Sequence, residues 1–299
     1  MTKSNTRQAA DVAHIVGRKN LIINGDFKVN QRYDLSSPLT STGNAYHIDR
    51  WTTWHGVANT IEKGSDVING VTRPTIKLTA TATATGHLGI NQRVEQQNVP
   101  VGVNITISCW LRSNHNKAGL RQNAILPEGD APTKHSGNGQ WEYHTWTQNT
   151  ATMAARPSVN FGVIIYDDAN VSITSGDYIE VADFQVEFGS VATDFEHRSY
   201  GEELALCQRY YLKTADGIYM SGQSYAANSV DGLRQVYPFP VTMRAMPTVS
   251  VSGGSDGGSV ATLQVMHPKI DSVVLNLRSN DGNTSVWWHS GVLTADAEL

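Results

Sequence analysis

The sequence has only two cysteines in 299 residues, Cys109 and Cys207. Disulfide frameworks belong to small chains that are dense in cysteine, so two buried free thiols are favoured here over a single disulfide. Residues 1–12 are polar and lack the apolar core of a secretory signal. No stretch approaches the ~20 apolar residues that span a bilayer. These absences predict a protein that is made in the cytoplasm and is not inserted into a membrane.

Charge is scarce as well. Charged residues make up 17% of the chain and the net charge is -4. Proteins that bind nucleic acid or anionic membranes electrostatically carry a basic surface, so neither partner is expected. The 26 glycines and the many Ser, Thr and Asn residues are typical of turn-rich β proteins rather than of helix bundles.

Motifs of common catalytic sites are missing. The sequence contains no G-x-S-x-G, no H-E-x-x-H and no phosphate-binding loop. Hydrolysis of a glycan needs two carboxylates that face each other across a cleft, and no spacing singles out such a pair. The ten histidines are scattered without metal-ligand spacing. The sequence therefore predicts a protein that is not an enzyme and has no histidine-built metal centre.

Apolar and polar residues alternate in short runs through residues 20–198, which predicts strands separated by turns. Strands are expected to begin at Leu21-Ile22-Ile23 and to recur at 51–54, 57–62, 74–80, 87–95, 103–112, 141–147, 158–165 and 178–188. Residues 114–140 are interpreted as a long loop, or as a strand such as 119–125 with loops on both sides. Eight or more strands with long polar connections favour a jelly-roll β-sandwich, with a closed up-and-down barrel as the alternative.

A seam between two β domains is expected within residues 181–211. Val181, Phe184, Val186 and Phe188 interleave with polar residues, which predicts a half-buried strand. A short helix is predicted over 201–207. The smaller C-terminal β domain then covers 199–299, with strands at 208–214, 217–222, 232–241, 247–252, 258–265, 271–277 and 285–292. Pro238 and Pro240 place one strand at an edge, 252–258 is predicted as an open turn, and 280–283 as a hairpin tip.

Residues 1–19 form a separate N-terminal segment. Val12, Ile15 and Val16 make a small apolar face on what would be a short helix. A disordered leader is the alternative, but the apolar face favours an anchor that docks on a partner or on a sister subunit.

The seven tryptophans supply the candidate binding residues. Sugar sites offer an exposed aromatic face surrounded by hydrogen-bonding side chains, and this mix predicts a glycan site at Trp141, Tyr143, Trp146 and Trp54. Trp141 and Trp146 lie five apart on one strand, so at least one of them faces the core. Trp51 and Trp110 are expected in the core. Of Trp287 and Trp288, one is expected to point outward as an oligomer or receptor contact.

Three blocks of sequence resemble tailed-bacteriophage virion proteins, namely tail fibres and related appendages. The blocks are NLIINGDF at 20–27 with Gln31-Arg32 and Asp49-Arg50-Trp51, then 187–211, then 239–249. The resemblance implies a short tail fibre or receptor-binding protein of the virion, a homotrimer that contacts other virion proteins through its N-terminal segment and adheres to host-surface polysaccharide. A capsid decoration protein or head fibre, and a polysaccharide depolymerase, are the alternatives.

Residues 20–188 also resemble jelly-roll carbohydrate-binding modules, through 24–27, 105–113 and 178–187. Such modules often hold a structural calcium between acids near the first and last strands, and the matching residues are Asp26 and Asp183. Lys28 replaces the acid that usually follows. Calcium is the one cofactor that the resemblance implies.

Overall fold

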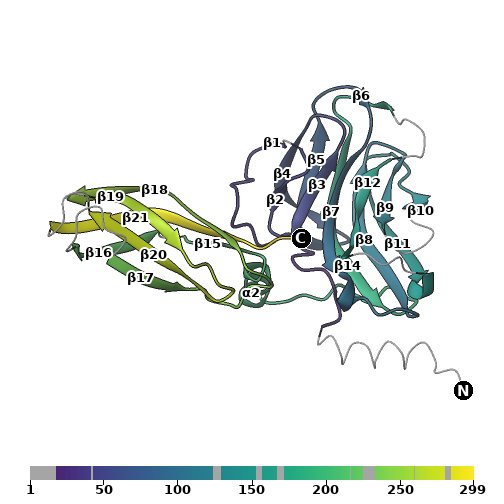
Figure 1. Ribbon diagram of the computed structural model, residues 1–299. Helices are drawn as coiled ribbons and strands as arrows, with labels where there is room; N and C mark the ends of the chain where they lie inside the picture. Colours follow the sequence, from purple (N-terminus) through teal and green to yellow (C-terminus); the bar gives the residue numbers. More distant parts are fainter. Residues whose placement is uncertain are drawn as a thin grey trace, which may run out of the picture. The chain divides into compact units, whose positions relative to one another are not determined.

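The computed structural model describes residues 18–41, 43–123, 129–152, 157–166, 172–215, 217–224, 233–258, 260–279 and 284–299. The chain divides into two compact units, one that ends at Tyr200 and includes Leu299, and one from Gly201 to Glu298 (Figure 1). The described residues are mostly strands, which confirms the predicted all-β class. No described helix is long and apolar enough to cross a membrane. The predicted anchor residues Val12, Ile15 and Val16 lie outside the described residues.

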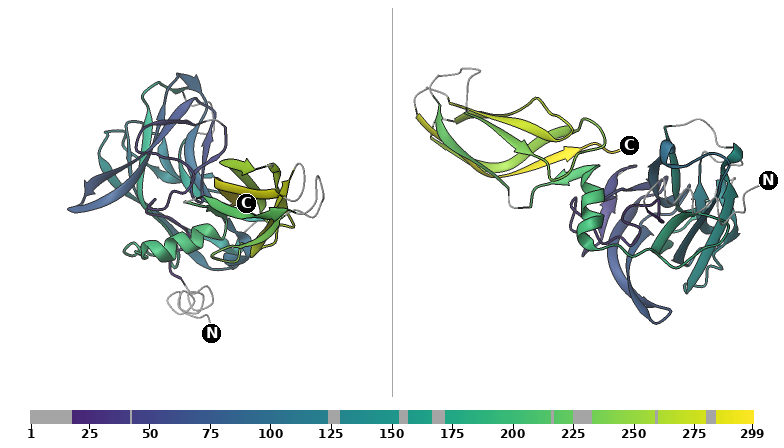
Figure 2. Two further views of the ribbon diagram at one scale, coloured as in Figure 1. Left: turned by 90° about the vertical axis from the view of Figure 1, so that its left-hand side faces the viewer. Right: turned by 90° about the horizontal axis from the view of Figure 1, so that it is seen from below.

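Within the described residues, the first unit is a sandwich of two six-stranded antiparallel sheets (Figure 2). Sheet A has the order β1 Leu39–Ser41, β4 Asn59–Ile68, β5 Val71–Ala80, β14 Tyr178–Phe188, β8 Asn104–Ser113, β11 Trp141–Asn149. Sheet B has the order β10 Gly129–Lys134, β9 Ala118–Gln122, β12 Ser158–Ile165, β7 Leu88–Glu95, β3 Trp51–His55, β2 Tyr46–Ile48. The short strands β6 Ala84–Thr85 and β13 Ser172–Ile173 pair separately, and 3-10 turns cover Gln96–Asn98 and Thr150–Thr152.

The chain passes back and forth between the two sheets, with β1 in sheet A, β2 and β3 in B, β4 and β5 in A, β7 in B, β8 in A, β9 and β10 in B, β11 in A, β12 in B and β14 in A, so the sandwich is confirmed over the barrel. All the strands predicted between residues 51 and 188 are present. Their inward side chains form one apolar core. At its centre Trp51 is fully buried, with its ring centroid 5.0 Å from that of Phe27 and 5.2 Å from that of Phe184. Each such side chain contributes about 1.5–3 kcal/mol through burial.

Residues 20–27, here called the plug segment, are irregular rather than the predicted strand start. β14 pairs with β5 only through Tyr178–Val181. Beyond that point the plug segment bonds to β14 instead: Phe184 N donates to Gly25 O at 2.9 Å, and Leu21 N donates to Val186 O at 2.8 Å. The apolar residues that suggested a strand are buried, but they satisfy the backbone of β14 at isolated points and form no ladder.

Asn24 holds the plug segment in shape. Its φ of 59° is in the left-handed region, which Asn tolerates better than most residues. The side-chain amide of Asn24 donates to Val29 O at 2.8 Å and to Asp49 O at 3.1 Å. The backbone carbonyl of Asn24 accepts the indole N–H of Trp51 at 2.8 Å. The first motif of the phage resemblance is therefore a structural element that locks the chain onto Trp51.

β14 is buried on both faces, so the prediction of a half-buried strand was wrong. The polar residues Gln185 and Glu187 are covered by the chain that follows the strand. Glu187 accepts hydrogen bonds from Thr193 N at 2.8 Å and from its hydroxyl at 2.6 Å, and Gln185 accepts one from Glu196 N at 2.9 Å. Alternation along the strand could not reveal this cover, because it comes from a neighbouring segment.

The second unit contains two smaller sheets in the described residues. It begins with α2 Tyr200–Gln208, which confirms the predicted helix. One sheet has the order β15 Tyr211–Lys213, β21 Thr284–Asp296, β16 Ile218–Ser224, with β18 Thr248–Gly258 also paired to β21; the other has the order β17 Leu233–Pro238, β20 Ser272–Ser279, β19 Val260–Met266. Their inward side chains form a separate core. The edge position of β17 agrees with its prolines.

One prediction for this unit was wrong. Residues 252–258 belong to β18 and pair with β21, because Gly253 and Gly254 adopt positive φ and let the strand bend without ending. The predicted hairpin tip at 280–283 lies outside the described residues.

Replacement of Gly25 by alanine is expected to destabilise the first unit by about 1–3 kcal/mol or more, because the new Cβ would overlap the carbonyl oxygen of Phe184. Urea unfolding followed by tryptophan fluorescence measures the change. Gly201→Ala is the matched control, since nothing lies within 4 Å of a Cβ there. Equal stability of the two variants would contradict the role given to Gly25.

Candidate functional site

Polar side chains line up in rows across the outer face of sheet B. In antiparallel strands, residues in register on one face are neighbours. One row runs Thr52–Asn91–Gly162–Arg121 over β3, β7, β12 and β9. The next row has Arg93, Asn160 and Asn123, and the row on the other side has Trp54, Gly89, Ile164 and Gly119. Residues from four strands thus share the same surface.

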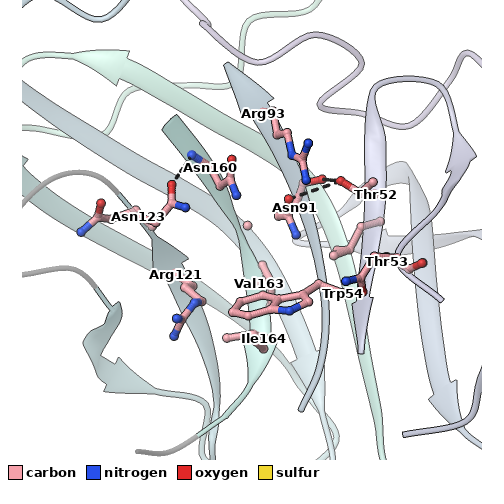
Figure 3. A pocket seen from close by; sticks show the side chains of 14 residues that line it. Thr52, Thr53, Trp54, Asn91, Arg93, Arg121, Asn123, Asn160, Val163 and Ile164 are labelled. Carbon is pink, nitrogen blue, oxygen red and sulfur yellow. Dashed lines mark hydrogen bonds between the residues drawn. The ribbon is translucent and has the colours of Figure 1, made fainter. Parts of the chain in front are cut away.

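These rows enclose a hollow of about 300 Å³ (Figure 3). Gly162 forms its floor between Asn91 and Arg121. A Cβ at Gly162 would overlap the carbonyl oxygen of Ile90 and lie 2.8 Å from the Cα of Asn91. Because Gly162 has no side chain, β12 can pack closely against β7. For the same reason, the space above Gly162 is open to a ligand.

Trp54 closes one side of the hollow. Its indole lies beside Ile164 and Arg121 (Figure 3), and Ile164 is only 1% exposed although it is on the outer face. The Arg121 guanidinium carbon is 4.7 Å from the centroid of the Trp54 ring and 5.0 Å from that of Tyr166. Each contact of this type contributes about 0.5–2 kcal/mol. Trp54 and Arg121 therefore position each other.

Amides supply the hydrogen-bonding groups. Asn91 Oδ1 accepts from the Thr52 hydroxyl at 3.3 Å, and Asn123 Oδ1 accepts from Asn160 N at 2.7 Å. In the part of the chain that the structure describes, no hydrogen bond is made by Nδ2 of Asn91 or by the side chain of Asn160. The hollow thus combines amide side chains, the Trp54 ring and the open surface at Gly162. Binding sites for small polar ligands usually have such features.

His87 borders this site next to Trp54, with 4.7 Å between the two ring centroids. Burial lowers the pKa of His87, and the positive charge of Arg121 and the neighbouring His55 lower it further. His87 is therefore held neutral beside the guanidinium. Burial likewise lowers the pKa of His144, with repulsion from His135 acting in the same direction against the attraction of Glu142.

Three of the four predicted glycan residues lie on the other sheet. Trp141 and Tyr143 occupy the outer face of β11, and Tyr143 is 46% exposed. The face of Trp141 is covered by Arg112 at 4.7 Å, and its Nε1 donates to Asp66 at 3.0 Å. Trp146 points inward from the same strand and packs against the core. The structure therefore does not bring Trp54 together with the other three.

Trp110 was expected in the core but lies on the outer face of sheet A. The inward positions of β8 belong to Cys109 and Leu111 on either side of it. Its ring centroid is 5.2 Å from that of Tyr143, and the guanidinium carbon of Arg73 is 5.7 Å from its ring centroid. The expectation for Trp51 is confirmed, and that for Trp110 was wrong because its strand alternates in the opposite phase.

The two candidate calcium ligands are each paired with a cation of the protein. Asp26 lies 2.6 Å from Lys28 Nζ, and Asp183 lies 2.6 Å from Arg73 Nε. No group of three or more His, Cys, Asp or Glu residues that could hold a metal occurs among the described residues. Calcium takes six to eight oxygen ligands, which backbone carbonyls supply as well as carboxylates. One carboxylate oxygen of each residue, Oδ1 of Asp26 and of Asp183, is buried without a hydrogen-bond partner. Calcium at this place stays a prediction.

In the second unit, Trp288 packs against the core. Trp287, the next residue on β21, stacks on His289 with 4.8 Å between ring centroids and 15° between the planes. Whether Trp287 serves as an oligomer or receptor contact stays a prediction. Cys109 and Cys207 are both free thiols and buried.

Most residues of the hollow escaped sequence analysis: Asn91, Arg93, Arg121, Asn123, Asn160 and Gly162. The available signal was the polar residue at every second position of the strands at 87–95 and 158–165. That signal is equally typical of any solvated sheet face, and only the pairing of non-consecutive strands turns it into a site.

The neutral state of His87 gives a testable titration. Arg121→Gln is expected to raise the pKa of His87 towards its ordinary value, because a repelling charge is removed. Since the folded-state pKa is lowered, this histidine contributes stability above its ordinary pKa, and that stability is lost as the pH falls through the lowered value. Imidazole NMR signals measure the pKa. His144 on sheet A is the internal control and is expected to be unchanged; an unaltered His87 would contradict the proposed coupling.

Neither a protein-family model nor a curated protein sequence matches this chain. Solved structures with a similar fold include the enzymatically active domain of tailspike protein 4 of bacteriophage CBA120, with 12% identity, 56% of this chain and 21% of that chain covered, and a TM-score of 0.38. TmCBM61, in complex with β-1,4-galactotriose, has 13% identity, 57% and 99% coverage and a TM-score of 0.32. The CBM22-1 xylan-binding domain of Paenibacillus barcinonensis Xyn10C has 11% identity, 54% and 99% coverage and a TM-score of 0.30. This chain thus spans about a fifth of the tailspike domain's length.

Proposed function

We propose that this protein is a structural component of a tailed-phage virion that binds a glycan, and that the glycan is bound in the hollow on the outer face of sheet B. The observation that carries the proposal is the arrangement of Asn91 and Asn160 around a glycine floor, next to Trp54. Sugars present hydroxyl groups for amide hydrogen bonds and C–H faces for aromatic contact, and these groups match both features.

The virion assignment is supported by the three sequence blocks that resemble phage appendage proteins. Adhesion to a host-surface polysaccharide, as a short tail fibre or receptor-binding protein, is the role in which a glycan site of this kind has an obvious use. Binding without hydrolysis is proposed because the described residues that line the hollow include no carboxylate, whereas glycoside hydrolysis uses two.

Substitutions at the hollow are expected to weaken glycan binding. Asn91→Ala removes an amide donor on the floor and is expected to raise Kd about tenfold, which corresponds to about 1.4 kcal/mol. Trp54→Ala is expected to raise Kd by at least as much, because the aromatic edge is lost and Arg121 loses its support. Binding is measured on an array of bacterial surface glycans and then by titration of the best ligand.

Tyr143→Ala is the matched control, since it removes an exposed aromatic residue from the opposite sheet. It is expected to leave Kd unchanged, and thermal melts exclude unfolding of each variant. Loss of binding in Tyr143→Ala with normal binding in Asn91→Ala would move the site to sheet A. Release of reducing ends from the bound polysaccharide would instead favour a depolymerase, and retention on capsids without adsorption to host cells would favour a decoration protein or head fibre.

The resemblance to phage appendage proteins implies a homotrimer, and we propose that it assembles through the N-terminal segment and the second unit. Light scattering of the full chain at micromolar concentration is expected to give three times the chain mass of 32.6 kDa. A mass of one chain would contradict the assembly part of the proposal and leave the glycan site untouched.

A further inference from the structure

Residues 135–140, here called the crossing loop, carry the chain from β10 in sheet B to β11 in sheet A. The loop turns tightly at Gly137 and Gly139, whose φ values of 80° and 74° lie in the left-handed region that favours glycine. A Cβ at Gly137 would lie 3.0 Å from the backbone nitrogen of Asn116, and Gly139 N donates to Ser113 O at 3.0 Å. The crossing loop is thus closed against the turn that precedes β9.

A buried imidazole fastens this closed conformation. The side chain of His135 is fully buried, and both of its ring nitrogens make contacts within the loop. Nδ1 accepts a hydrogen bond from Gly137 N at 2.9 Å, and Nε2 lies 2.9 Å from Gln140 O. A carbonyl oxygen only accepts, so Nε2 carries the proton, and Nδ1 carries none because it accepts. The crossing loop is therefore closed on a neutral histidine in a single tautomer.

Protonation of His135 removes one of these two bonds. An imidazolium has two N–H groups and no acceptor, so its Nδ1–H would face the N–H of Gly137. The two donors repel each other, and the charge of a fully buried ring is disfavoured by its loss of hydration. An open loop relieves both effects, because Nδ1–H then reaches water.

Glu142 on β11 is the acid that faces this ring, with 3.8 Å between its Oε1 and His135 Nε2. Its oxygens already accept from Ser136 N, at 3.2 and 3.3 Å, and from the Ser136 hydroxyl. Its contact with His135 is made to Nε2, which is already directed to Gln140 O. Glu142 therefore attracts an imidazolium but does not accept the new proton, which is on Nδ1.

A second imidazole opposes protonation as well. His144 on β11 is 4% exposed and stacks on His135, with 5.9 Å between the ring centroids and 23° between the planes. Its Nε2 lies 3.3 Å from Glu142 Oε2, so two imidazolium groups would share one carboxylate. Other titratable groups on the elements packed against the loop are those of His115 and Lys117 before β9, Lys134 on β10 and Tyr178 on β14. None of these four is an anion near neutral pH.

We propose that the crossing loop is a pH-operated element, which is closed while His135 is neutral and is released when His135 takes up a proton. The closed loop has no place for the second proton, so it is favoured above the pH range in which histidine ordinarily titrates and is lost as the pH falls through that range. Release loosens the end of the sandwich at which the chain passes from β10 to β11. This inference goes beyond glycan binding in the hollow and does not depend on it.

Amide hydrogen exchange of the full chain, followed by NMR, measures release. Protection factors are compared, because the intrinsic exchange rate itself changes with pH. Protection of the Gly137 amide is expected to fall at least about tenfold between about pH 7.5 and about pH 5, the range in which histidine titrates. Protection of the amides of β14 is expected to stay constant over the same range, which distinguishes local release from unfolding.

His135→Asn is the decisive variant. An Asn side-chain oxygen accepts the N–H two residues on, as Asn138 does from Gln140 N at 2.8 Å in the same loop, and it does not titrate. The Gly137 amide is therefore expected to stay protected at both pH values. His144→Gln keeps a neutral donor for Glu142 and removes a repelling charge, so it is expected to move the midpoint of release to higher pH.

His115→Asn is the matched control, because the adjacent turn contains the same type of bond, from Lys117 N to His115 Nδ1 at 3.1 Å. It is expected to leave the release of the crossing loop unchanged. An acid response that persists in His135→Asn, or that is lost in His115→Asn, would overturn the inference. Constant protection of Gly137 in the unsubstituted chain would do the same.

Melting curves at neutral pH establish that each variant folds. If His135→Asn does not fold, the ring-nitrogen NMR shifts of His135 in the unsubstituted chain decide the question. They are expected to report protonation of Nδ1 over the same pH interval as the loss of Gly137 protection. Protonation of Nδ1 without release, or release without protonation, would overturn the inference. Neither result bears on glycan binding at sheet B.

Discussion

The contact between Gly25 and the backbone of Phe184 is the constraint on which the sandwich depends. β14 is the longest strand of sheet A, and it leaves β5 after Val181. β8 still pairs with its other edge up to Phe188. The backbone groups on the edge that β5 leaves would be buried without partners if the plug segment did not reach them, and each such group costs about 1–3 kcal/mol. Asn20 meets two of them directly: its side chain accepts from Val186 N at 3.0 Å and donates to Phe184 O at 3.2 Å.

The plug segment also holds the residues around Trp51 in place. Asn24 ties the plug segment to Trp51, and Asp49 beside Trp51 accepts a hydrogen bond from Gln31 Nε2 at 2.9 Å. Burial raises the pKa of Asp49 above its usual range, against the hydrogen bonds and the charge of Arg32 that oppose this rise. Arg50, only 1% exposed and with φ of 71°, donates to Arg93 O at 2.6 Å. The D-R-W motif thus joins the plug segment to β7, one of the strands that carry the hollow.

Sequence analysis was strong where the information is local. Alternation identified most strands of the two sheets, since the period of two belongs to each strand by itself, but it missed β1, β2 and β10. It was weak where a second segment decides the outcome. The polar face of β14 was judged to be solvated, although residues 193–196 cover it, and the glycine-rich run at 252–258 was judged to be a turn, although β21 pairs with it. The phase of alternation was likewise misjudged at Trp110.

The candidate site depended almost entirely on long-range pairing. Trp54 was one of the four residues predicted to bind a glycan, but its neighbours in the hollow come from β7, β9 and β12, which are separated from it by 35 or more residues of chain. Trp141 and Tyr143 looked equally suitable by composition. Only the structure reveals that Arg112 and Asp66 already occupy the indole of Trp141, whereas Trp54 borders a hollow.

Successive side chains of β3 point to opposite faces of sheet B, so the strand contributes both to the core and to the hollow. Trp51 and Thr53 point inward, where they bond to the plug segment and to the first strands, and Thr52 and Trp54 point outward to the hollow. A change at an inward position costs core packing, but a change at an outward position alters only the surface that a ligand meets. The first block of the resemblance includes the inward residue Trp51. The ligand of the hollow must instead be inferred from outward residues such as Trp54, Asn91 and Asn160, which the first block does not contain.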